Sequence, residues 1–180
     1  MSWANVYFGD SLLSRNGSQN TTDILKNKKF VGIYFSAHWC PPCRQFTPFL
    51  AEFYETVKDD DENALEIIFA SKDEDQATFD ESFGDMPWKA IPFEGGSYAQ
   101  ELSAKYGQHG IPTLVVLSMM DGTIRDIDAR STIASAKGSV DIVLAKWEGL
   151  EGESKDNYGN SDDDDEPEEK AAGARGKKKK

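Results

Sequence analysis

The chain has 180 residues, of which 38% are hydrophobic and 29% charged, a composition typical of one soluble domain with an appendage. The formal net charge of -12 argues against a nucleic-acid binder that depends on basicity and against a protein held on anionic membranes by charge. Only two cysteines are present, three positions apart, which excludes a secreted disulfide scaffold and leaves no second pair for a zinc ribbon.

The N-terminal residues 1–5 lack the basic and apolar segments of a secretory signal. The longest apolar runs, such as residues 114–117, are far shorter than the roughly 20 residues that span a bilayer. We therefore expect a cytoplasmic protein in a reducing compartment, with the nucleus as an alternative because a lysine run ends the chain at residues 177–180. In such a compartment, closely spaced cysteines are catalytic or metal-binding rather than structural.

The first thirty residues are weakly patterned. We predict a strand beginning at Leu12 and Leu13, a turn at Asn16-Gly17, and a second short strand over residues 21–25. Residues 31–35 form a continuous apolar run, typical of a strand buried on both faces. Beyond the cysteines, apolar residues recur at helical spacing and predict an amphipathic helix that ends in acidic residues 59–62; they are Phe46, Phe49, Leu50, Phe53 and Val57.

The pattern then predicts further strands and helices in alternation. Strands are expected at residues 65–70 and 113–118, and the turn Asp121-Gly122 leads into a last strand at 123–126. Apolar spacing predicts three helices, marked by Phe79 and Phe83, by Ala99, Leu102 and Tyr106, and by Val140, Val143, Leu144 and Trp147. Strands separated by helices pair in parallel, and the late hairpin adds an antiparallel edge. We therefore predict an α/β fold, a mixed central β-sheet flanked by helices on both faces.

Composition changes abruptly near Gly149. Residues 151–180 hold ten acidic and seven basic residues but only one aromatic residue, Tyr158. Such a segment cannot bury enough apolar surface to offset the entropy lost on ordering. We expect a folded domain over residues 1–149 and a disordered, acidic-then-basic tail over residues 150–180.

The two cysteines lie where the predicted strand gives way to the predicted helix. Pro41 and Pro42 suit a first helical turn, because the N–H that proline lacks would have no partner there. Cys40 then lies at the helix N-terminus, where free N–H groups and the helix dipole stabilise a thiolate. Cys43, one turn inside the helix, can attack the mixed disulfide that Cys40 forms with a substrate. We predict that Cys40 is the nucleophile and Cys43 the resolving cysteine.

Other interpretations of the cysteines are a pair of small buried hydrophobic residues, or a zinc or iron–sulfur site. Such a site would join Cys40 and Cys43 to His38 and His109, the only two histidines. The prolines stiffen the loop that would have to wrap the metal. We therefore expect no metal and no other cofactor.

The motif Trp39-Cys40-Pro41-Pro42-Cys43-Arg44 resembles the active site of tryparedoxins and nucleoredoxin-like proteins, two branches of the thioredoxin superfamily. The resemblance covers about residues 28–148 and implies a thioredoxin fold and a thiol–disulfide oxidoreductase. Further segments match in order: Tyr34-Phe35-Ser36-Ala37, Phe46-Thr47-Pro48, Met86-Pro87-Trp88 and Ile111-Pro112-Thr113.

The resemblance also implies roles in substrate binding. Pro112 would be the cis-proline facing the disulfide, and the backbone of Ile111 would pair with an extended substrate segment. From the residues alone, a trans proline that starts a strand is the better interpretation of Pro112. Trp39, with the neighbouring residues Pro41 and Pro42, would form an apolar rim for docking proteins. Arg130 matches an arginine that could bind a carboxylate of a glutathione-derived ligand, although an ordinary surface arginine fits equally well.

Two positions differ from those of related proteins. Many thioredoxins carry a buried aspartate where this chain, like tryparedoxins, has Tyr34, so the base for Cys43 is open, with Asp73 or a water as candidates. Lys72 stands where tryparedoxins have a tryptophan that helps to bind trypanothione, which weakens the case for that reductant. Trp88 is either a packing residue or a contact residue.

The leading hypothesis is a monomeric protein-disulfide reductase with no nucleic-acid or membrane partner. Its clients would be disulfide-containing proteins, with peroxiredoxins implied by the resemblance. A dithiol, trypanothione or a glutathione-like compound, or else a reductase, would regenerate the cysteine pair. The alternative is a redox-sensitive protein-binding module of the nucleoredoxin type. A chaperone-like scaffold without turnover is a third hypothesis, against which the intact cysteine pair argues.

Overall fold

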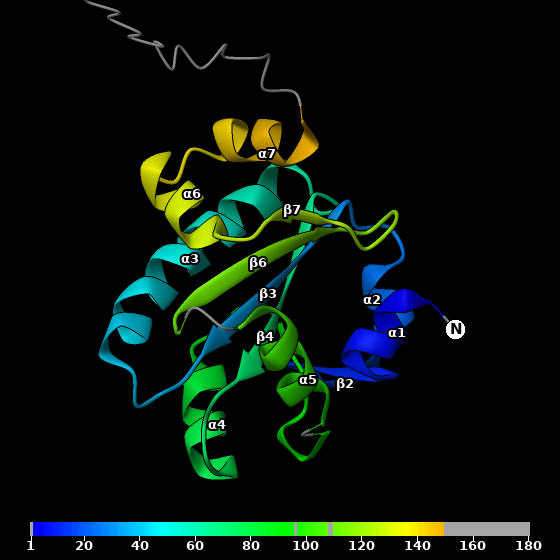
Figure 1. The fold of residues 1–180 in the computed structure, drawn as a ribbon, viewed down its shortest axis with the longest axis vertical. Helices are drawn as coiled ribbons and strands as arrows, with labels where there is room; N and C mark the ends of the chain where they lie inside the picture. The colour runs from blue at the N-terminus through cyan, green and yellow to red at the C-terminus, as the bar shows by residue number, and fades with distance from the viewer. Residues whose placement is uncertain (1, 96, 108–109, 150–180) are drawn as a thin grey trace, which may run out of the picture.

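The computed structural model describes residues 2–95, 97–107 and 110–149, so His109 and the predicted tail lie outside the described residues. The helices are α1 Trp3–Phe8, α2 Thr21–Leu25, α3 Pro41–Asp60, α4 Gln76–Gly84, α5 Ser97–Tyr106, α6 Ala129–Ser135 and α7 Val140–Glu148, with a 3-10 turn at Phe93–Gly95 (Figure 1). The strands are β1 Ser11–Ser14, β2 Gly17–Asn20, β3 Phe30–Ser36, β4 Leu65–Ser71, β5 Lys89–Ala90, β6 Thr113–Ser118 and β7 Ile124–Asp126. None of the helices in these ranges is long and apolar enough to cross a membrane.

The strands form one mixed sheet in the order β2-β1-β5-β4-β3-β6-β7. β4 pairs in parallel with β3 and β5, whereas the other neighbouring strands are antiparallel. β3 lies between β4 and β6, and every residue of β3 is buried. The α/β fold with a mixed central sheet is therefore confirmed.

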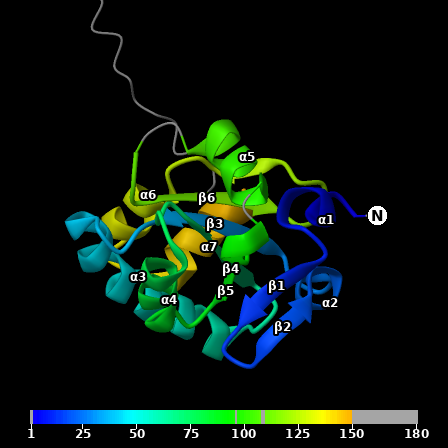
Figure 2. The ribbon, with the colours of Figure 1, turned by 90° about the horizontal axis from the view of Figure 1, so that it is seen from below.

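Helices cover both faces of the sheet because successive side chains of a strand point to opposite faces. Tyr34 of β3 packs in a cluster with residues of α3, α4, α6 and α7. Phe35, the next residue, belongs to a second cluster with residues of α1, α2 and α5. Figure 2 shows α3, α4 and α6 on one side of the strands and α1, α2 and α5 on the other. Continuous burial of β3 thus follows from having an apolar layer on each side.

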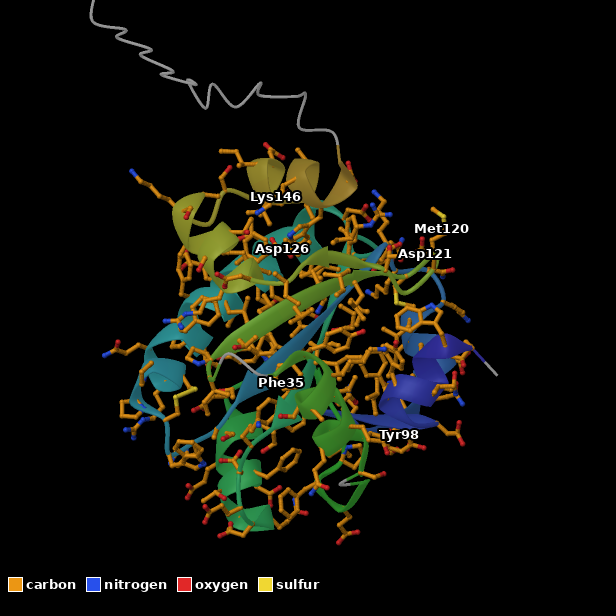
Figure 3. The ribbon with its side chains drawn as sticks, in the orientation of Figure 1. Phe35, Tyr98, Met120, Asp121, Asp126 and Lys146 are labelled. Carbon is orange, nitrogen blue, oxygen red and sulfur yellow. A yellow bond between two sulfur atoms is a disulfide. The ribbon has the colours of Figure 1, made fainter. Side chains whose placement is uncertain are left out.

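The last helix is fixed to the sheet edge by a buried carboxylate. Asp126 of β7 accepts a hydrogen bond from Trp147 Nε1 at 3.0 Å and forms an ion pair with Lys146 at 3.6 Å. Asp126 and Lys146 lie close to α6 and α7 in Figure 3. The indole of Trp147 is buried against Phe30, so α7 closes the core at the start of β3.

The prediction of a strand over residues 21–25 was wrong, since these residues form α2. Asn20 caps this helix, and its side-chain oxygen accepts hydrogen bonds from the backbone nitrogens of Thr22 and Asp23 at 2.9 and 3.3 Å. The second strand of the hairpin instead covers Gly17–Asn20, and the turn lies at residues 15–16, one residue before the predicted Asn16-Gly17. The short helices α1 and α6 were not predicted, and the other predicted strands and helices are confirmed.

Candidate active site

The cysteine pair lies at the junction of β3 and α3, as predicted. Cys40 is the N-cap of α3, and its sulfur accepts a hydrogen bond from the backbone nitrogen of Cys43 at 3.3 Å. Pro41 and Pro42 occupy the first helical positions. Cys40 and Cys43 form a disulfide with their Cα atoms 5.2 Å apart, so the structure shows the oxidised state of a redox-active pair.

The surroundings of the disulfide are unequal on its two sides. Cys43 is 1% exposed and Cys40 4% exposed, while the neighbouring Trp39 is 57% exposed. Pro41 and Pro42 are also exposed. The indole nitrogen of Trp39 donates a hydrogen bond to the carbonyl of Lys72 at 3.3 Å, which holds the ring beside the end of β4. The disulfide therefore lies under an exposed apolar rim.

The Ile111–Pro112 segment reaches the disulfide because of strand register. β6 runs antiparallel to β3 with Thr113 opposite Phe35, so the residues before Thr113 lie at the edge where β3 ends. The Ile111–Pro112 peptide bond is cis, as the resemblance implies and against the interpretation from the residues alone. The carbonyl oxygen of Ile111 lies 3.8 Å from the sulfur of Cys40.

Arg130 lies at the same edge of the sheet. It is an exposed residue in the first turn of α6, and its Nη1 donates a hydrogen bond to the carbonyl of Pro112 at 3.5 Å. Its guanidinium also stands 5.7 Å from the ring centroid of Phe46, a residue of α3. The structure thus brings Arg130 together with the cis-proline segment.

Tyr34, which replaces the buried aspartate of many thioredoxins, is fully buried. Its hydroxyl forms a hydrogen bond with Oγ1 of Thr47 at 2.7 Å, and burial raises the pKa of the Tyr34 phenol. The ring of Trp88 packs edge-on against Tyr34 with 5.6 Å between centroids, and Trp88 is 0% exposed. Trp88 is therefore a packing residue, and Tyr34 keeps its proton at neutral pH.

Asp73 forms a buried hydrogen-bond network behind the cysteine turn. Its Oδ1 accepts from the backbone nitrogen of His38 at 2.7 Å. Its Oδ2 accepts from the hydroxyls of Ser71 at 2.7 Å and Ser82 at 2.9 Å. The network joins β4, α4 and the turn before Cys40. The parts played by Ser71 and Ser82 were missed from the sequence, where both are ordinary serines with no local motif.

His38, Cys40 and Cys43, the described members of the alternative metal site, each have another partner. His38 Nε2 lies 3.1 Å from a carboxylate oxygen of Glu81. Both cysteine sulfurs are committed to the disulfide. Across residues 2–95, 97–107 and 110–149, no three His, Cys, Asp or Glu side chains are grouped as metal ligands.

The chain is similar to proteins of known family. A family model described as thioredoxin-like matches residues 27–124, which is more than half of the chain. The chain belongs to the thioredoxin-like family. This thioredoxin-like chain is 41% identical over 123 residues to tryparedoxin of Trypanosoma brucei brucei, covering 68% of this chain and 83% of that protein. It is 43% identical over 105 residues to nucleoredoxin of Danio rerio, covering 58% of this chain but only 25% of that longer protein.

Solved structures give the same assignment. Tryparedoxin I from Crithidia fasciculata superposes on this thioredoxin-like chain with a TM-score of 0.70 and 34% identity, covering 77% of this chain and 94% of that one. A structure of tryparedoxin II complexed with glutathionylspermidine has a TM-score of 0.66 and 32% identity, covering 71% and 87%. The resemblance inferred from the cysteine motif is therefore confirmed.

Proposed function

We propose that the chain is a protein-disulfide reductase that works through Cys40 and Cys43. The observation that carries this proposal is the Cys40–Cys43 disulfide at the N-terminus of α3, beside the cis Ile111–Pro112 peptide. In the reduced protein, the Cys40 thiolate attacks a client disulfide and releases one client thiolate. Cys43 then attacks the Cys40 sulfur, releases the second client thiolate and forms the internal disulfide.

The assignment of Cys40 as nucleophile is supported by its position. As N-cap, it adjoins the free N–H groups and the positive end of a helix of 20 residues. Those groups stabilise a thiolate at Cys40 relative to its thiol. Cys43 lies deeper, at 1% exposure, where a client disulfide has poorer access to its sulfur. The two cysteines thus divide into an attacking and a resolving residue.

The client would dock on the exposed rim around the disulfide. Trp39, Pro41 and Pro42 offer an apolar surface, and Ile111 packs beside both cysteines. The backbone of Ile111 would pair with an extended client segment, as in other β-type peptide recognition. We propose peroxiredoxins as clients because the motif around Cys40 and Cys43 resembles that of tryparedoxins.

The reductant that regenerates the pair is proposed to be a small dithiol, trypanothione or a glutathione-like compound. The glutathionylspermidine complex of tryparedoxin II supports this choice, and Arg130 beside Pro112 would bind a carboxylate of the ligand. Lys72, in place of the family tryptophan, favours a ligand other than trypanothione. A protein reductase is the alternative source of electrons, and we propose a cytoplasmic location for either reaction.

The first test is dithiothreitol-driven reduction of insulin disulfides by the wild type and by Cys40→Ser. We expect rapid reduction by the wild type and only the background rate with Cys40→Ser. Cys43→Ser also lacks the internal disulfide and is the matched control for its loss. It should give only the background rate of turnover but, unlike Cys40→Ser, should form a mixed disulfide with insulin. Equal rates for folded wild type and Cys40→Ser would reject the reductase.

A redox-sensitive binding module is the second candidate, favoured by the 43% identity to nucleoredoxin of Danio rerio. Such a module would hold a partner on the Trp39 rim and release it when the cysteines are oxidised. Association with a partner that persists in Cys40→Ser, together with the absence of turnover, would select this function over the reductase.

A further inference from the structure

Cys43 lines a second opening that is separate from the docking rim. This cavity of about 180 Å³ has Cys43, His38, Arg44, Glu81, Ser82 and Asp85 in its wall, and the wall includes neither Cys40 nor Ile111. A client bound over Cys40 and Ile111 would therefore leave this cavity in contact with solvent. The volume is enough for several water molecules, which can connect a buried sulfur to groups at the mouth.

The cavity presents one pair of groups suited to moving a proton near neutral pH. His38 Nε2 lies 3.1 Å from Glu81 Oε2, with side-chain exposures of 41% and 62%. Imidazole is the side chain that ordinarily gains and loses a proton between pH 5 and 8. A neighbouring carboxylate stabilises the imidazolium that forms when the proton arrives. The pair thus combines a proton acceptor with a group that stabilises its charged form.

Asp73, the base candidate from the sequence, is placed differently. It is absent from the cavity wall, and its carboxylate already accepts three hydrogen bonds, from the His38 backbone and from two serine hydroxyls. One of these hydroxyls belongs to Ser82, which does line the cavity. Asp73 is therefore a positioning residue that holds the His38 turn and the Ser82 side chain.

We propose that the His38–Glu81 pair accepts the proton of the Cys43 thiol, through water in this cavity, during the resolving step. The Cys43 S–H bond breaks and its proton passes to the imidazole. The Cys43 thiolate then forms the bond to the Cys40 sulfur as the Cys40–client bond breaks, and the client leaves as a thiolate carrying the electron pair. The imidazolium later returns the proton to solvent. This step rests on the reductase function proposed above.

The other charges around the cavity act on the same proton transfer. Arg44 of α3 favours the Cys43 thiolate, whereas Glu81 of α4 and the following Asp85 oppose it and favour the imidazolium. Asp73 adds a further negative charge behind Ser82. Asp85 shares the cavity wall with the pair but has no ion pair with His38 among the described contacts, so Asp85→Asn is a matched control for charge.

The test is single-turnover reaction of the reduced full chain with 5,5′-dithiobis(2-nitrobenzoate) in a stopped-flow spectrometer between pH 5.5 and 8.5. The first thionitrobenzoate released reports attack by Cys40, and the second reports resolution by Cys43. In His38→Ala, we expect an unchanged first phase and a second phase slower by about tenfold at pH 7. A general base contributes about 10²–10⁴-fold to a rate, and a base that acts through water contributes less. Added imidazole should restore the rate of the second phase. Glu81→Gln should slow the second phase by a smaller factor than His38→Ala does. Asp85→Asn removes a charge from the same wall without an ion pair to His38, so it should slow the second phase less than Glu81→Gln.

Three results would overturn the proposal. They are an unchanged second phase in His38→Ala, a change in the first phase alone in that variant, and a slowing of the second phase by Asp85→Asn as large as that by Glu81→Gln. His38 and Glu81 are at least partly exposed, so we expect their variants to fold. Circular dichroism checks this. Failure of the reductase itself looks different, because wild type would then release the first thionitrobenzoate no faster than Cys40→Ser.

Discussion

Nη1 of Arg130 donates a hydrogen bond to the carbonyl of Pro112 at 3.5 Å, which ties the first turn of α6 to the segment that faces the disulfide. The two residues are 18 positions apart and come from opposite sides of the β6–β7 hairpin. The guanidinium has further donors beyond this one bond, and Arg130 is exposed. We propose that those donors bind a carboxylate of the reductant beside the cis-proline segment.

Replacing Arg130 with Ala should weaken the reaction with carboxylate-bearing dithiols. A hydrogen bond between a guanidinium and a carboxylate contributes about 1.5–3 kcal/mol, so we expect KM for dihydrotrypanothione or a glutathione-like dithiol to rise about tenfold or more. Dithiothreitol has no carboxylate, and its rate should change little. Arg125→Ala on β7 is the matched control. An equal change for both reductants would show that Arg130 acts only by holding Pro112.

Replacing Cys43 with Ser should arrest the reaction after its first step. Cys40 retains its place as N-cap of α3, so attack on a client disulfide proceeds, but no second sulfur can resolve the product. We expect a long-lived mixed disulfide through Cys40, detected by non-reducing electrophoresis and peptide mass spectrometry. Cys40→Ser is the reciprocal control and should trap little client. Equal trapping through either cysteine would contradict the assigned roles.

Replacing Asp73 with Ala should destabilise the fold at the active-site turn. The change leaves three donors without their acceptor: the His38 backbone nitrogen and the hydroxyls of Ser71 and Ser82. Hydrogen bonds to buried charged groups contribute about 1.5–3 kcal/mol each, and relaxation recovers part of this, so we expect a loss of about 3 kcal/mol in the free energy of unfolding. Urea denaturation measures the loss. The adjacent exposed Glu74→Ala is the control and should change stability little.

The strands that carry the site were predictable because their signal is local. β3, β4 and β6 are short apolar runs buried on both faces, and the spacing of Cys40 and Cys43 fixes the strand-to-helix junction. α2 was not predictable in this way. Threonine and isoleucine favour a strand, and the side chain of Asn20 decides for a helix by capping it.

The link from Asp73 to His38 was beyond prediction for a different reason. The two residues are 35 positions apart and meet only because β3 and β4 pair in parallel with Ser36 opposite Ser71. No residue pattern near either one specifies that register. The cis peptide before Pro112 followed from the family resemblance and not from the local sequence, which alone favours a trans proline that starts a strand.

Glu66 of β4 should make stability depend on pH. It is 3% exposed, and burial raises its pKa above the ordinary value of 4.5, an effect partly offset by the hydrogen bond that Tyr54 donates at 2.9 Å. The folded chain therefore retains this proton to higher pH than the unfolded chain does. Stability contributed by Glu66 is full below pH 4.5 and falls as pH rises through the raised folded pKa.

Glu66→Gln removes this titration while keeping an oxygen that can accept from Tyr54. We expect the stability of Glu66→Gln relative to wild type to increase steadily from pH 4 to pH 8 in urea denaturation, because only the wild type must ionise a buried carboxyl. Glu62→Gln, an exposed glutamate nearby, is the matched control and should show no such trend. A difference in the free energy of unfolding between wild type and Glu66→Gln that stays constant across this range would mean that Glu66 has the same pKa in the folded and unfolded chains. The positive charges of Lys28 and Lys89, which lower its pKa, would then fully offset its burial.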